Sequence, residues 1–145
     1  MPASLSPSQK LFQTTCWVGV VIWVSTVFYL SSRPSAELME DLPFFMQAWD
    51  KALHFIAFFC GVLPLVPALR LTYGWPWKKV CIVAVGLVSL YGALDEVHQL
   101  WTPSRSGLSP GDWLADTLGA LAGAPLAAFV HALIERQNRP APAGN

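Results

Sequence analysis

Charged residues are scarce in this chain of 145 residues. Asp, Glu, Lys and Arg together make up 12% of the sequence, which is about half of the roughly 25% found in an average soluble domain. Hydrophobic residues make up 54%. So few charges argue against a disordered chain, a nucleic-acid-binding protein and an ordinary cytosolic enzyme. The composition predicts a membrane protein surrounded by a lipid bilayer, and the length predicts a single domain.

Paired cysteines are also missing. Cys16, Cys60 and Cys81 each stand alone inside an apolar stretch, and no CxxC pair occurs. Neither a disulfide framework nor a zinc knuckle is therefore indicated. We interpret all three as small apolar packing residues.

Four long stretches contain no Asp, Glu, Lys or Arg. They cover residues 12–32, 52–69, 80–94 and 117–134. A bilayer core of about 30 Å needs about 20 helical residues to cross it. None of the stretches alternates as a strand does, and lipid tolerates only helices or closed barrels. The pattern predicts an all-α bundle of four transmembrane helices, the third of which continues through residues 95–99.

The first apolar stretch resembles a signal peptide because Lys10 gives it a weak basic region, but no small-residue cleavage motif follows it. We expect it to be retained as the first helix. Residues 1–139 then form one four-helix domain, with the polar motifs between residues 50 and 124. The proline-rich residues 140–145 are expected to be a disordered tail.

Basic residues are unevenly divided between the two sides of the predicted bundle. Six lie on the side of the termini and three on the other: Lys10, Arg70, Lys78, Lys79, Arg136 and Arg139 against Arg33, Lys51 and Arg105. Lys and Arg are enriched in cytoplasmic loops. Both termini are therefore predicted to be cytoplasmic.

Acidic residues show the opposite distribution. Eight of the nine fall on the outer side, namely Glu37, Glu40, Asp41, Asp50, Asp95, Glu96, Asp112 and Asp116, and only Glu135 lies inside. The negative electrostatic field of these acidic residues concentrates cations and cationic ligand groups. The net charge of zero therefore hides a strong polarity between the two sides.

The outer polar residues recur at helical spacing. Residues 50 and 54, 95 and 99, and 112 and 116 are each four apart, so each pair shares one helix face. Small residues continue these faces into the membrane, which predicts that they point into the bundle rather than at lipid. The candidate binding site comprises Asp50, His54, Asp95, Glu96, His98, Gln99, Arg105, Asp112 and Asp116.

Simpler roles stay open for some of these residues. Asp50 and Asp112 are suited to capping helix N-termini, and pairs with Lys51 or Arg105 would be weak surface ion pairs. Capping does not explain residues 95–99, because acids are unfavourable at a helix C-terminus. Arg105 is suited either to bridging carboxylates or to holding an anionic group.

Three blocks of this sequence together resemble the VanZ-like family of small bacterial membrane proteins. They are residues 50–55 (DKALHF), residues 95–99 (DEVHQ), and Arg105 followed by residues 112–119 (DWLADTLG). The resemblance implies a multi-pass protein of the bacterial plasma membrane. It also implies a link, in some members, to teicoplanin-type glycopeptide resistance. The family often has Asn where this chain has Asp116, so this chain adds a carboxylate.

Three functions remain open at this stage. The acidic side can bind or modify an envelope lipid, glycan or glycopeptide. It can instead belong to a membrane-embedded enzyme that uses paired carboxylates, or a divalent cation held among His54, Asp95, His98 and Asp116. Proton-coupled transport is the third alternative. No nucleic-acid partner is expected, a homo-oligomer stays open, and no motif defines a reaction.

Overall fold

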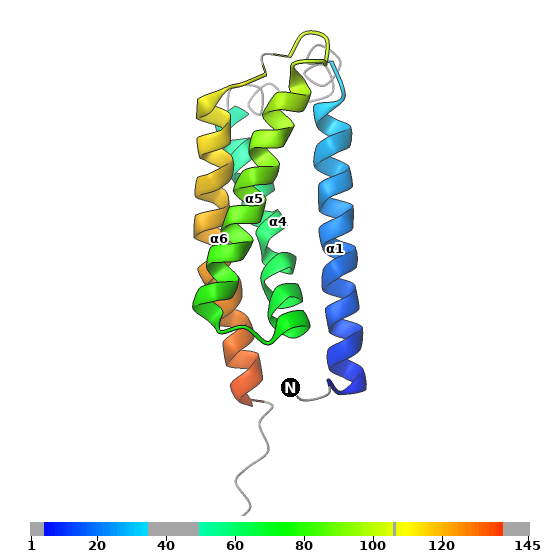
Figure 1. Cartoon of the computed structure of the whole chain (residues 1–145), viewed down its shortest axis with the longest axis vertical. Coiled ribbons are helices and arrows are strands. Elements are labelled where there is room, and N and C mark those ends of the chain that lie inside the picture. The colour runs from blue at the N-terminus through cyan, green and yellow to red at the C-terminus, as the bar shows by residue number, and fades with distance from the viewer. Residues whose placement is uncertain (1–4, 35–49, 106, 138–145) are drawn as a thin grey trace, which may run out of the picture.

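The described part of the chain is entirely helical. The computed structural model describes residues 5–34, 50–105 and 107–137, and these contain four α-helices and no strand. The helices are α1 (Pro7–Ser31), α4 (Asp50–Tyr73), α5 (Trp77–Gln99) and α6 (Pro110–Gln137), and each is long and apolar enough to cross a membrane (Figure 1). The predicted four-helix membrane fold is confirmed, including the extension of the third helix through residue 99. Glu37, Glu40, Asp41 and the predicted tail at 140–145 lie outside the described residues.

Local signals explain where the helices begin and end. Ser6 and Gln9 form a capping box at the start of α1, and Pro7 occupies its first position, where a missing N–H costs nothing. Gly74 follows α4 with φ 65°, a left-handed conformation that favours glycine. Only three residues separate α4 from α5, so these two helices run antiparallel.

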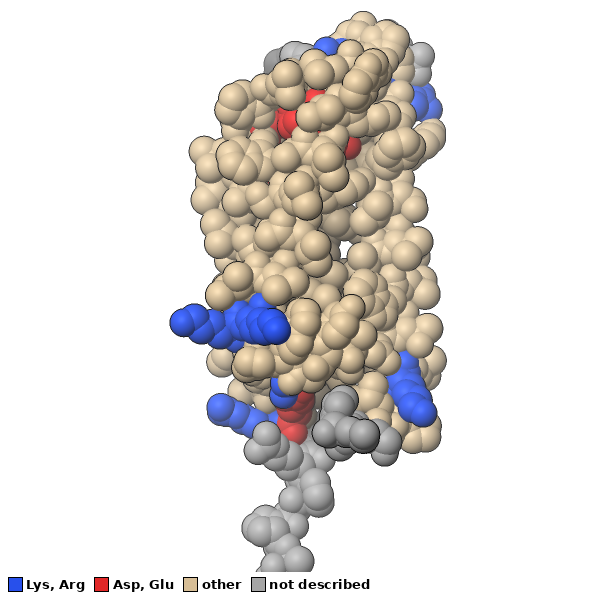
Figure 2. All heavy atoms as spheres, viewed as in Figure 1, with Lys and Arg blue, Asp and Glu red and all other residues tan. Residues whose placement is uncertain are grey.

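The helices alternate in direction, which gives the bundle two chemically different ends (Figure 1). We call one the acidic end, defined by Asp50, Asp95, Glu96, Asp112 and Asp116. We call the other the basic end, defined by Lys10, Arg70, Lys78, Lys79 and Arg136. Figure 2 shows acidic side chains near both ends and most of the basic side chains toward the basic end. α4 contacts all three other helices, whereas α1 packs mainly on α4.

An apolar core fills the bundle between these ends. It contains Phe58, Val62 and Val66 of α4, Val80, Ala84 and Val88 of α5, and Ala120 and Ala124 of α6. α4 and α6 are in close backbone contact at Gly119, where an added Cβ would overlap the Phe55 carbonyl oxygen and lie 2.9 Å from the Phe59 nitrogen. Small residues permit such backbone contact between membrane helices, and this contact holds the starts of α4 and α6 together at the acidic end.

The orientation of the bundle across the membrane stays a prediction. We expect a reporter fused after residue 145, or inserted in the turn at residues 74–76, to report the cytoplasm, because the basic end should face it. A reporter in the α5–α6 loop is the control and should report the opposite side. A periplasmic signal from either of the first two fusions would contradict this topology.

Candidate functional site at the acidic end

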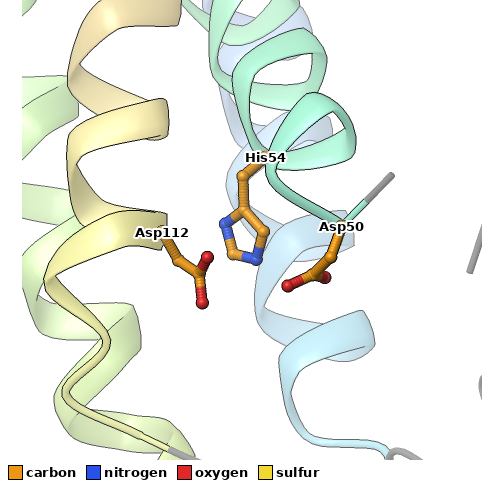
Figure 3. Close-up of side chains that lie close together, drawn as sticks. All are labelled: Asp50, His54 and Asp112. Carbon is orange, nitrogen blue, oxygen red and sulfur yellow. The ribbon is translucent and has the colours of Figure 1, made fainter. Parts of the chain in front are cut away.

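Three side chains from two helices meet at the acidic end. Asp50 and His54 lie on the first turns of α4, and Asp112 lies on the first turn of α6. One potential ligand atom from each lies within 4.8 Å of the other two. Figure 3 shows the imidazole of His54 between the two carboxylates. Asp50 is exposed, whereas Asp112 is buried, so this cluster extends from the surface into the bundle.

A buried carboxylate lies behind His54. The Nδ1 atom of His54 is 2.9 Å from Oδ1 of Asp116, whose side chain is only 1% exposed. Asp116 packs against α5 at Gly92, where an added Cβ would lie 2.8 Å from its Oδ2 atom. A residue larger than glycine at position 92 would displace this carboxylate. The contact between Nδ1 of His54 and Asp116 therefore fixes the imidazole ring and leaves Nε2 as its outward nitrogen.

Lys51 neutralises one of the carboxylates. Its Nζ atom lies 2.7 Å from Oδ1 of Asp112, and the lysine side chain is 65% exposed. Asp112 does not cap α6: the Oγ atom of Ser109 accepts a hydrogen bond from the Asp112 backbone N–H at 3.3 Å. A serine directly before Pro110 is a recognisable capping signal. The Asp112 carboxylate is thus available for contacts outside its own helix.

Glu96 shapes the loop between α5 and α6. Its Oε2 atom accepts a hydrogen bond from the Ser109 N–H at 2.7 Å, and its backbone oxygen accepts one from Leu108 at 3.2 Å. Leu108 has φ 64°, which is strained for a branched side chain. The buried carboxyl group and the backbone oxygen of Glu96 together accept the two hydrogen bonds that hold the strained loop at the start of α6.

The other polar residues of α5 face α1. Oδ2 of Asp95 accepts hydrogen bonds from the Ser31 hydroxyl at 2.7 Å and from the Gln99 amide at 2.9 Å. The Nε2 atom of His98 lies 3.1 Å from the hydroxyl oxygen of Ser32. The contacts within the described residues thus link Asp95 and His98 to α1 rather than to His54. The gathered group of Asp50, His54 and Asp112 shares only His54 with the metal set predicted above.

Arg105 binds the end of α1. Its guanidinium donates hydrogen bonds to the backbone oxygens of Leu30 at 2.8 Å and Arg33 at 3.2 Å, and Thr102 donates to that of Ser31 at 3.1 Å. A cation is favourable at a helix C-terminus, where carbonyls lack partners. Within the described residues Arg105 bridges no carboxylates. Sequence reasoning missed Ser31 and Thr102, because hydroxyl and carbonyl partners leave no charge pattern.

The fold and this cluster define a class of protein. Four membrane-length helices with ionisable side chains gathered at one end describe a multi-pass membrane protein with a polar cluster at one end of its bundle. Residues 11–131 match the VanZ/LLP1 family, and the chain belongs to that family. The match confirms the resemblance of residues 50–119 and also includes most of α1. No curated protein and no solved structure matches the chain.

Proposed function

We propose that the acidic end binds a positively charged group of a cell-envelope molecule at the outer face of the bacterial plasma membrane. The convergence of Asp50, His54 and Asp112 within 4.8 Å of one another carries this proposal. Asp50 is exposed, so a ligand can reach the cluster without entering the bundle. A cationic group would offset the repulsion between neighbouring carboxylates. Because the family resemblance implies a link to glycopeptide resistance in some members, a glycopeptide or its envelope target is the ligand class to test first.

Binding accounts for the interior of the bundle better than transport does. Between the acidic end and the basic end, the core of the described helices consists of apolar side chains such as Val62, Val66 and Ala124. Proton relays through membranes use chains of acidic and histidine residues. Because the ionisable groups gather at the two ends, we place the function at one surface rather than along a path through the bundle.

A susceptibility assay tests the proposal. We expect expression of this chain in a host without family members to change teicoplanin susceptibility, and Asp50→Asn and Asp112→Asn to remove that change. Asn keeps the shape of Asp and removes the charge that attracts a cation. Glu135→Gln, at the basic end, is the matched control and should behave as the unaltered chain.

Membrane abundance must be measured in the same cells. Loss of the phenotype at normal abundance supports a charge-dependent binding site. If the Asp50→Asn and Asp112→Asn variants both change susceptibility as much as the unaltered chain does, at normal abundance, the acidic end does not bind a cationic group in this way.

A divalent cation is a second candidate ligand. A metal-binding histidine usually donates its other ring N–H to a carboxylate, and His54 has Asp116 in that position at 2.9 Å. Nε2 is then free to bind an ion together with Asp50 and Asp112. Carboxylates combined with imidazole suit Mn, Zn or Fe. Lys51 holds Oδ1 of Asp112, so an ion would use the other oxygen or displace the lysine.

Titration of the purified protein with Mn²⁺ and Zn²⁺ distinguishes the two candidates. If the metal site exists, Asp50→Asn should abolish binding, and Asp116→Asn should weaken it by about 10–100-fold because it orients the histidine. His98→Asn is the control and should bind as the unaltered chain. Equal affinity in all four proteins would contradict the metal site and leave an organic cation as the ligand.

A further inference from the structure

The chain places an ammonium group of its own at the acidic end. Nζ of Lys51 lies 2.7 Å from Oδ1 of Asp112, which is the length of a charge-assisted hydrogen bond. The end of the lysine side chain passes beside Gly111, where an added Cβ would lie 3.1 Å from Cε and 3.2 Å from Nζ. Glycine at position 111 therefore leaves the lysine room to reach the carboxylate. The contact shows that Asp112 accepts an ammonium as a hydrogen-bond donor.

The two partners of this contact differ in how easily they can leave it. The side chain of Lys51 is 65% exposed, whereas that of Asp112 is 12% exposed. Exposed ion pairs contribute little free energy, and the ammonium of lysine sits on a flexible stem of four carbons. Lys51 can therefore move into water at small cost. The carboxylate of Asp112 cannot follow it, and a mostly buried charge favours a replacing cation.

The acceptors around this position have the spacing that a primary ammonium needs. Such a group has three N–H donors, and three acceptors at about 2.8 Å from a tetrahedral nitrogen lie about 4.6 Å from one another. One potential ligand atom from each of Asp50, His54 and Asp112 lies within 4.8 Å of the other two. Figure 3 shows the imidazole ring between the two carboxylates. Because Nδ1 of His54 donates to Asp116 at 2.9 Å, Nε2 has a lone pair that can accept.

We propose that the positive charge of the ligand is a primary ammonium, which displaces Lys51 from Asp112. The ammonium of the ligand then donates hydrogen bonds to Asp50, His54 and Asp112. Lys51 is a competitor tethered to the site, and it lowers the affinity for every ligand of this class. A quaternary ammonium has no N–H and cannot make these bonds. The inference rests on the proposed function, because it assigns the chemistry of the cation that the acidic end binds.

Ethanolamine and choline test the class of cation. Both carry a hydroxyethyl group and one positive charge, but only ethanolamine has N–H donors. We expect the purified chain in detergent micelles to bind ethanolamine at least about tenfold more tightly, because hydrogen bonds to charged groups are strong. Binding is followed by the NMR signals of the three histidines, labelled with ¹³C. The signal of His54 should shift, whereas that of His131, at the basic end, should not.

Lys51→Met tests the competition. Methionine keeps most of the length of the side chain and removes its charge, so both the ion pair and the repulsion of an incoming cation are lost. The affinity for ethanolamine should rise by about 5–25-fold. Lys51→Arg retains the charge and is the matched control, which should bind ethanolamine no more tightly than the unaltered chain. Because Lys51 is largely exposed, both variants should fold as the unaltered chain does.

The possible failures of this inference are distinguishable from one another. Equal affinity of Lys51→Met and the unaltered chain for ethanolamine overturns the competition, while binding itself still supports a cationic ligand at the acidic end. Equal affinity of the unaltered chain for ethanolamine and choline overturns the assignment to a primary ammonium and leaves the proposed function standing. If neither probe shifts the His54 signal in any of the three proteins, the inference and the proposed binding of an organic cation both fail.

Discussion

Replacing His54 by leucine is expected to destabilise the folded chain by about 3–5 kcal/mol, because it leaves a buried carboxylate without its partner. The partner is Asp116, whose side chain is 1% exposed and lies 2.9 Å from the imidazole. Leucine cannot accept or donate a hydrogen bond, and the other oxygen of the carboxylate packs against Gly92 on α5. Reversible unfolding in mixed detergent micelles measures the loss.

Two further variants separate this effect from a general loss of polarity. His98→Leu removes the contact with the Ser32 hydroxyl and should cost about 1 kcal/mol or less. The double variant His54→Leu, Asp116→Leu removes both partners, so it should recover most of the stability lost in the single variant. If the double variant is less stable than His54→Leu, the two side chains are not an energetically coupled pair.

Substituting Gly119 by alanine should lower the free energy of unfolding by about 3 kcal/mol or more, which is the upper end of the usual cost of overpacking. The added methyl group would meet the backbone of α4 at Phe55 and Phe59, and backbone cannot rotate out of the way. α4 and α6 must then separate at the acidic end. Unfolding in micelles and the mutual contact of the two helices, followed by cysteine cross-linking, report the change.

Gly86 provides the matched control. An added Cβ at this position in α5 meets nothing within 4 Å. Gly86→Ala should therefore be neutral or stabilise the chain by up to about 1 kcal/mol, since alanine is the better helix former. Equal effects of the two substitutions would mean that the close approach of α4 and α6 contributes nothing to stability.

The helices could be predicted because charge is excluded from the membrane interior. Absence of charge marks residues 52–69 and 117–134 almost directly, and the extension through residue 99 followed from the length that a span needs. The face shared by Asp50 and His54 followed from helical spacing. The short distance from Asp50 and His54 to Asp112 could not be predicted in the same way. No pattern within one helix encodes how that helix is rotated against a neighbouring helix.

The contacts of α1 were beyond prediction for a different reason. Its apolar stretch is uniform, so sequence pattern does not distinguish the side that meets α5 from the side that meets lipid. Ser31 and Ser32 resemble ordinary residues at a helix end, yet they bind Asp95 and His98. The role of Arg105 depends on backbone carbonyls, which every residue carries. Charge counting therefore assigned Arg105 either to carboxylates or to an anionic ligand group.

The thin attachment of α1 has a consequence for assembly in the membrane. α1 buries the smallest share of its residues among the four helices, and Trp23 anchors it by packing over Gly61 and donating a hydrogen bond to the Ala57 carbonyl. A subassembly of α4, α5 and α6 already brings Asp50, His54, Asp112 and Asp116 together. α1 then occupies Asp95 through Ser31, and Arg105 through the carbonyls of Leu30 and Arg33. The packing of one helix thus leaves fewer charged groups at the acidic end to meet a ligand.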